Sequence, residues 1–234
     1  ENTRVLFEAA PGAQGGRHFG GRIVQGRSGR LFLTIGDRGD RPSAQDLSRH
    51  NGSVVRINRD GSVPADNPFV GREGAQPEIW SYGHRNPQGA SLDARGRLWV
   101  HEHGARGGDE VNLVRKGANY GWPVIAYGRH YSGARIGEGT HKPGMEQPVL
   151  YWDPSIAPSG LVIHSGQGAP GWRGDFFVGS LKFDMIARLR GGPLTEVARL
   201  RSPETLRVRA LREGPAGALW IVSEGRGAIY RLAP

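Results

Sequence analysis

The chain has 234 residues, no cysteine and a formal net charge of +9. This length suits one large domain or two small ones, and the aromatic residues spread along it exclude a disordered protein. The lack of cysteine excludes disulfides, thiol catalysis and cysteine-bound zinc, and no apolar run is long enough to span a membrane. The charge favours an anionic partner, but the arginines are scattered without a basic helix or a basic–aromatic repeat, so we expect no nucleic acid.

Strand patterns dominate along the chain, because short apolar or alternating runs lie between glycines. One polar stretch, 43–50, predicts about two helical turns. The predicted strands are 29–37, 52–61, 96–104, 160–166, 175–192 and 217–234.

A unit recurs in these patterns. The segments IVQGRSGRLFLTIGD, ASLDARGRLWVHEHG and LREGPAGALWIVSEG each contain an apolar strand, a polar turn that ends in glycine, and a second strand that begins with Leu and an aromatic residue. Repeated antiparallel units with short turns indicate an all-β fold of the β-propeller type, with a β-sandwich as the alternative. No linker is visible, so we predict a single β-propeller domain over 1–234.

Two candidate catalytic residues come early in the chain. His18 lies in the glycine-flanked loop GRHFGGRI, just ahead of a strand. It is either a surface histidine or a general base, since imidazole titrates near neutrality. Asp37 follows a buried type of strand in TIGDRGDRP, where it is either a turn residue or a carboxylate that orients a histidine or a substrate hydroxyl.

The segment GHRNPQG concentrates hydrogen-bond donors. Arg85, Asn86 and Gln88 lie around Pro87, which keeps the preceding asparagine extended. The segment is either a connecting turn or a cluster that recognises carbonyl and carboxylate oxygens.

The stretch EHGARGGDEVNL combines a glycine-broken loop with two adjacent acids. Asp109 and Glu110 are hard oxygen ligands, and backbone carbonyls near Gly104 add further ones, which is calcium chemistry outside the EF-hand pattern. His101 and His103 lie on one face of a strand, but a third histidine at ligand spacing is missing, so we expect no zinc.

Three cations lie within strand patterns. They are Lys182 in SLKFD and Arg207 and Arg209 in LRVRALR, and the two arginines share one strand face. They are either solvent-exposed charges of an edge strand or a cradle for a small polyanion.

Taken in order, these stretches resemble the soluble pyrroloquinoline-quinone (PQQ)-dependent sugar dehydrogenases, the glucose/sorbosone dehydrogenase family, and above all the periplasmic aldose sugar dehydrogenases. The motifs are RPSAQDLSRHNGSVVRINRDGSVPADNPF, IWSYGHRNPQGASLD, EHGARGGDEVNLVRKGANYGWPV and EQPVLYW, and the likeness covers nearly all of the chain from Arg17 onward. It implies a six-bladed propeller with the quinone lying near the central axis, of which this chain covers about four blades.

The resemblance also implies roles for individual residues. His18 corresponds to the base that takes the proton from the anomeric hydroxyl of the sugar, and Asp37 to a carboxylate that supports this step. Arg85 and Asn86 correspond to cofactor contacts, the arginine near the quinone carbonyl that is reduced. The other matches are Gly104 and Ala105, whose carbonyls bind the calcium that grips the cofactor; Glu110 and the Tyr120 carbonyl, which bind a second calcium; and Tyr131, Leu181, Lys182, Arg207, Arg209 and, more weakly, Ser155, which form the walls and carboxylate partners of the cofactor.

We therefore expect a quinoprotein oxidoreductase, periplasmic or secreted, that oxidises the anomeric carbon of aldoses to lactones. Hydride passes to calcium-bound PQQ, and the electrons pass to an external acceptor. Family members have further chain before the region of His18, and this chain begins at Glu1 without a methionine or signal peptide, so we expect it to be N-terminally incomplete. Two other functions stay open: a non-enzymatic propeller that binds sugars or proteins, and a calcium-dependent lactonase-like hydrolase. The oligomeric state and the preferred sugar are open as well.

Overall fold

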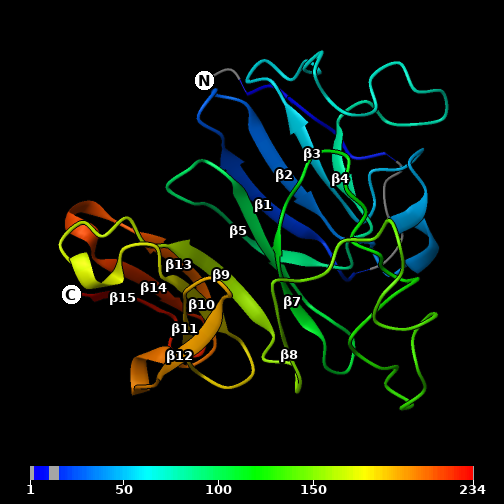
Figure 1. Ribbon diagram of the computed structural model, residues 1–234. Helices are drawn as coiled ribbons and strands as arrows, with labels where there is room; N and C mark the ends of the chain where they lie inside the picture. The colour runs from blue at the N-terminus through cyan, green and yellow to red at the C-terminus, as the bar shows by residue number, and fades with distance from the viewer. Residues whose placement is uncertain (1–2, 11–15, 234) are drawn as a thin grey trace. The chain divides into compact units, whose positions relative to one another are not determined.

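The computed structural model describes residues 3–10 and 16–233. Within these residues the regular structure is almost entirely β, in four antiparallel sheets (Figure 1). The contacts within the chain divide it into two compact units, Glu1–Pro87 with Val114–Gln147 and Gln88–Leu113 with Pro148–Pro234. The single domain expected from the sequence stays a prediction.

The first unit contains one sheet with its strands in sequential order: β1 (Gly20–Gln25), β2 (Leu31–Ile35), β3 (Ser53–Ile57) and β4 (Ile79–Tyr82). The turn between β1 and β2 uses Gly29 at φ 81°, a left-handed conformation that glycine adopts without strain. Val54 and Val55 of β3 are both fully buried. Because neighbouring residues of a strand point to opposite faces, this sheet is covered on both sides at β3.

The second unit contains three sheets: β5 (Pro87–Leu92), β6 (Leu98–Glu102), β7 (Asp109–Leu113) and β8 (Leu150–Trp152); β9 (Pro158–Ile163), β10 (Phe176–Ser180), β11 (Ile186–Arg190) and β12 (Thr195–Leu200); and β13 (Val208–Glu213), β14 (Leu219–Ser223) and β15 (Ala228–Leu232). One hydrophobic cluster joins the first two of these sheets. In it Trp99 packs edge-on against Phe176, with ring centres 4.9 Å apart. A second cluster joins the sheet of β9–β12 to that of β13–β15, with Phe177 and Leu211 fully buried. Each large apolar side chain buried in these clusters contributes about 1.5–3 kcal/mol, so face-to-face packing of sheets holds this unit together.

The repeat seen in the sequence is confirmed. Its three copies are the first hairpins of three sheets, β1–β2, β5–β6 and β13–β14. The fourth sheet begins with a longer hairpin, in which the short 3₁₀ helix η2 (Pro170–Trp172) lies between β9 and β10. Sheets of three or four sequential antiparallel strands are the blades of a propeller.

Three local expectations were wrong. The predicted helix over 43–50 is a 3₁₀ helix, η1 (Arg41–Gln45), that ends early because the Asp46 side chain accepts hydrogen bonds from the backbone N–H and hydroxyl of Ser48 and so competes with the helix. The predicted strand over 175–192 is two strands, and Lys182 lies in the turn between β10 and β11. The predicted strand over 217–234 is likewise two strands, β14 and β15. No helix among the described residues is long and apolar enough to cross a membrane.

Candidate active site

His18 lies just before β1, and its side chain contacts the carboxylate that follows β2. Its Nδ1 is 2.6 Å from Oδ1 of Asp37, and its side chain is 19% exposed whereas that of Asp37 is fully buried. His18 has φ 55°, in the left-handed region that costs energy for a residue with a side chain. Strain of this kind is concentrated at functional sites. The contact itself brings together the histidine and the aspartate that the sequence singled out.

The Asp37 carboxylate has donors on both oxygens. Oδ1 also accepts from the backbone N–H of Gly39 (2.7 Å), and Oδ2 accepts from the indole N–H of Trp122 (2.8 Å). Burial by itself raises the pKa of Asp37, but these hydrogen bonds and the one from His18 outweigh it, so the pKa lies below its ordinary value. Because an ionised carboxylate only accepts, Nδ1 of His18 donates, and Nε2 is the basic nitrogen of the neutral ring.

Arg85 and Asn86 follow β4 and are buried in the first unit. The carbonyl of Arg85 accepts from the N–H of Asp37 (2.9 Å), and its guanidinium lies 5.2 Å from the centre of the Trp122 ring. Oδ1 of Asn86 accepts from the N–H of Gly20 (3.2 Å). These contacts place both residues beside the histidine–aspartate pair.

The glycine-broken loop after β6 turns tightly back on itself. A Cβ at Gly104 would collide with the backbone of Gly107 and Gly108, so only glycine fits there. Ala105, whose carbonyl the resemblance assigns to calcium, is buried and forms an isolated bridge with Gly107. The tight turn and this bridge therefore hold the loop in one conformation, which sets the directions of its carbonyl groups.

Asp109 braces this loop. Its Oδ1 accepts from the N–H of Gly104 (2.8 Å) and from the hydroxyl of Ser155, and its Oδ2 accepts from the N–H of Ala157 (2.8 Å). Three donors thus occupy the two oxygens. The sequence offered both adjacent acids as cation ligands, but in this structure Asp109 serves the loop, and Glu110 is the acid with oxygens left for a cation.

Glu102 and Glu110 stand directly opposite each other in the antiparallel pair β6–β7. Each has an oxygen 3.2 Å from Nδ2 of Asn112, and the buried Oδ1 of Asn112 has no hydrogen-bond partner among the described residues. Burial, followed by the charge of Glu102, raises the pKa of Glu110 to about 8. Like charges across a strand pair are destabilising, and a hard cation would relieve the repulsion.

The donor set at this point fits calcium. It comprises two carboxylates and the Asn112 amide oxygen, which has no partner within residues 3–10 and 16–233, and these are the oxygen ligands that calcium takes. No cluster of three or more histidine or acidic side chains suited to a metal exists in the part of the chain that the structure describes. A cation here would therefore also need amide or backbone carbonyl oxygens.

Two of the three cations expected to form the cradle bind one carboxylate. Arg207 and Arg209 each donate from Nε to Glu224 at 2.8 Å. Leu181 is adjacent, since its carbonyl lies 3.5 Å from Nη1 of Arg207. Arg207 precedes β13 at φ 48°, so the expectation that both arginines lie within the strand is wrong, although both side chains meet at Glu224. Nζ of Lys182 lies 5.0 Å from the centre of the neighbouring aromatic ring.

The two tyrosines expected in the site have different surroundings within the first unit. Tyr120 is buried and stacks on His84 with ring centres 4.5 Å apart. Tyr131 is 75% exposed, on the segment between Val114 and Gln147. Of the two histidines expected on one strand, His101 lies in β6, whereas His103 follows the strand and has its Nε2 2.7 Å from the carbonyl of Pro158 in β9.

Sequence reasoning missed four residues of these clusters. Trp122, Asn112 and Glu102 lie in motifs of the sequence analysis but received no role there. Glu102 and Glu224 each lie one hairpin away from their partners. Alternation along β7 was a usable signal for Asn112, because residues two apart share a strand face. No local signal identifies the other three.

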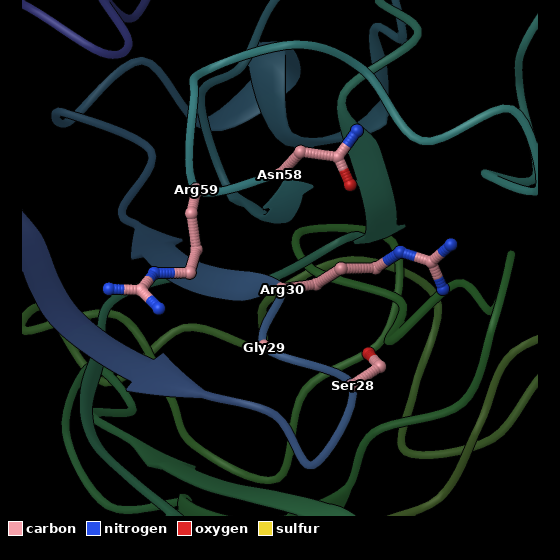
Figure 2. Close-up of a pocket in the computed structure, with 5 residues that line it drawn as sticks. All are labelled: Ser28, Gly29, Arg30, Asn58 and Arg59. Carbon is pink, nitrogen blue, oxygen red and sulfur yellow. The ribbon is translucent and has the colours of Figure 1, made fainter.

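One surface pocket lies apart from these clusters, between the β1–β2 turn and the turn after β3. Figure 2 shows that the side chains of Arg30 and Arg59 point in opposite directions there. Arg30 instead reaches Asp66, at 3.4 Å. An anion site needs cations that converge, so this pocket does not form one. It is lined by Ser28, Gly29, Arg30, Asn58 and Arg59.

The chain is similar to several known proteins. Residues 1–231 match the model of the glucose/sorbosone dehydrogenase family. Aldose sugar dehydrogenase YliI of Escherichia coli (strain K12) is 41% identical over 237 residues, which cover 99% of this chain and 64% of that protein. A glucose dehydrogenase crystal structure is 43% identical with a TM-score of 0.95, and the match covers 100% of this chain and 69% of that one. The PQQ-bound aldose sugar dehydrogenase of Streptomyces coelicolor is 29% identical with a TM-score of 0.72, over 94% of this chain and 63% of that one.

These matches cover nearly the whole of this chain, which spans 64% of the length of the Escherichia coli relative. The likeness to the solved structures confirms the all-β propeller fold predicted from the sequence. With 231 of its residues matched by the family model, the chain belongs to the glucose/sorbosone dehydrogenase family.

Proposed function

We propose that this chain is part of a PQQ-dependent aldose sugar dehydrogenase that oxidises the anomeric carbon of aldoses to lactones. The observation that carries the proposal is the contact between His18 and the buried, ionised Asp37. Family membership, the name of the Escherichia coli relative and the bound PQQ of the Streptomyces coelicolor structure support it. We further propose that it works in the periplasm or outside the cell and passes electrons to an external acceptor.

His18 serves as the general base. Its Nδ1–H is donated to Asp37, so Nε2 accepts the proton of the anomeric hydroxyl as the carbon loses hydride. Asp37 stabilises the imidazolium that forms, because its carboxylate stays ionised next to the ring. When bound, PQQ supplies the acceptor for the hydride, and calcium supplies a Lewis acid.

The remaining expected residues hold the cofactor and its metal ions. Arg207, Arg209 and Lys182 bind the carboxylates of PQQ, with Leu181, Tyr131 and Ser155 as further contacts. Arg85 and Asn86 bind at the quinone end, where the buried guanidinium stabilises developing negative charge. The carbonyls of Gly104 and Ala105 bind one calcium, and Glu110 and the Tyr120 carbonyl bind a second.

The direct test is His18→Gln. The variant should still show the PQQ absorption band on titration with PQQ and calcium, but should reduce an artificial dye with an aldose at least about two powers of ten more slowly, the usual worth of a positioned base. Glutamine has similar length and hydrogen-bonds, but it does not accept a proton at neutral pH. His141→Gln is the matched control, because His141 is exposed and lies outside the described site.

Three outcomes contradict the proposal. If the full-length protein that contains this chain gains no PQQ band and oxidises no aldose, it is a binding module and not a dehydrogenase. If it hydrolyses lactones without quinone, it is a hydrolase. If His18→Gln reduces dye at the wild-type rate, the base is another residue.

A further inference from the structure

Trp122 reaches the histidine–aspartate pair from a distant part of the chain. Its indole N–H donates to Oδ2 of Asp37 at 2.8 Å, although 85 residues separate the two. Both side chains are buried. Hydrogen bonds therefore link three side chains of the first unit in series, Trp122 to Asp37 and Asp37 to His18.

The Trp122 backbone is tied down on both sides. Its N–H donates to the carbonyl of Gly83 (2.9 Å), and its carbonyl accepts from the side chain of Gln45 (2.7 Å). Two guanidinium groups lie at its ring, that of Arg85 at 5.2 Å and that of Arg41 at 5.7 Å from the ring centre. Both distances fall within cation–π range, so backbone and ring are held and the N–H has one direction.

We infer that Trp122 is a positioning residue for proton transfer, acting on His18 through Asp37. This inference rests on the proposed function, in which His18 accepts the proton. The terminal torsion of an aspartate is broad and about two-fold, so a carboxylate held at only one oxygen turns readily. Gly39 and His18 both bind Oδ1, and among the described residues Trp122 is the partner that binds Oδ2. The indole N–H thus keeps the carboxylate in the orientation that receives Nδ1–H and leaves Nε2 of His18 as the base.

The alternative is that Trp122 only fills space in a core. The two roles separate at one atom, because packing and cation–π contact need the ring, whereas positioning needs the N–H. Replacing Trp122 by its sulfur isostere, β-(3-benzothienyl)alanine, keeps the bicyclic ring and removes the donor. Trp122→Phe removes the donor together with part of the ring.

The first readout needs neither sugar nor cofactor. In the wild-type chain labelled with ¹⁵N-histidine, His18 should give a slowly exchanging Nδ1–H resonance and a neutral Nδ1–H tautomer. In both Trp122 variants that proton should exchange at least about tenfold faster, and the ring should become a mixture of tautomers, the result of losing one charge-assisted hydrogen bond. In aldose oxidation the isostere should lower kcat by about 10–100-fold with KM little changed.

Trp99→Phe is the matched control. The indole N–H of Trp99 also donates to an aspartate, Asp93, at 3.0 Å, and the guanidinium of Arg97 lies 5.8 Å from the Trp99 ring centre. Trp99 belongs to the second unit, whereas His18 belongs to the first. It should leave the His18 resonance and kcat unchanged. An isostere variant with wild-type His18 exchange and tautomer would overturn the inference, whatever its activity. A full-length wild-type protein with the expected His18 signals but no sugar oxidation would overturn the proposed function alone.

Discussion

At the scale of single residues, two adjacent acids have opposite surroundings. Asp109 accepts three hydrogen bonds from the loop and from the segment before β9, whereas Glu110 faces Glu102 across a strand pair. In a chelating buffer, Asp109→Asn should lose about 1–3 kcal/mol in the free energy of unfolding, because an amide nitrogen leaves a buried donor without an acceptor. Glu110→Gln should be neutral or stabilising in the same buffer above about pH 8, where Glu110 is ionised, because it removes one of two facing charges.

Urea denaturation of the two variants with and without calcium checks this pair. Both substitutions are isosteric and concern neighbouring positions, so each is the control for the other. Calcium should stabilise the wild type and Asp109→Asn more than Glu110→Gln. Equal losses for the two variants in chelator, with no response to calcium, would remove the metal role of Glu110.

At the scale of elements, the end of β2 lies against the loop that precedes β1. Gly36 follows β2, and a Cβ there would collide with the carbonyl of His18. We expect Gly36→Ala to push the loop outward, to lengthen the contact between His18 and Asp37, and to lower kcat at least tenfold, with about 1–3 kcal/mol lost to overpacking. Circular dichroism should show the sheet retained.

Gly171→Ala is the control for this substitution, since a Cβ at Gly171 meets nothing within 4 Å. The measurement is the dye-reduction rate together with the His18 Nδ1–H resonance. A Gly36→Ala variant in which both are unchanged would show that the close approach of this loop to β2 has no part in placing the histidine.

At the scale of the whole molecule, stability should depend on pH through Glu110. Its pKa is about 8 in the folded chain and 4.5 ordinarily, so between these values the folded state keeps a proton that the unfolded state has released. Stability is therefore full below the lower value and is lost as pH rises towards about 8. Each kcal/mol lost lowers Tm by about 2–4 °C for a chain of this size.

Thermal melts in chelator from pH 5 to 8.5 test this dependence. We expect Tm to fall across the window in the wild type, to fall less in Glu110→Gln, and to fall less with calcium present, because a bound cation favours the ionised carboxylate. A wild-type Tm that rises over the same window would contradict the sign of the Glu110 shift.

The repeated hairpins were predictable because their information is local. A glycine turn followed by Leu and an aromatic residue specifies two paired strands within about fifteen residues, and each copy of the repeat became such a hairpin. The strands of the fourth sheet were predicted, but its first hairpin was not recognised as a copy of the repeat, because a 3₁₀ helix lengthens that hairpin. Lys182 was misplaced because apolar residues on both sides of a tight turn read as one continuous strand.

By itself, the sequence determined the all-β fold class, the family, and the candidacy of His18 and Asp37, since each follows from short motifs and their order. Only the tertiary structure decided that Trp122 joins this pair, that Glu102 stands opposite Glu110, and that Arg207 and Arg209 share Glu224. The physical reason is that these contacts depend on strand register and on the path of loops between distant segments. For Glu102, Glu110 and Arg209, which lie in strands, a shift of one residue in register would turn the side chain to the other face of its sheet, and what prevents it is the packing of whole sheets rather than any local pattern.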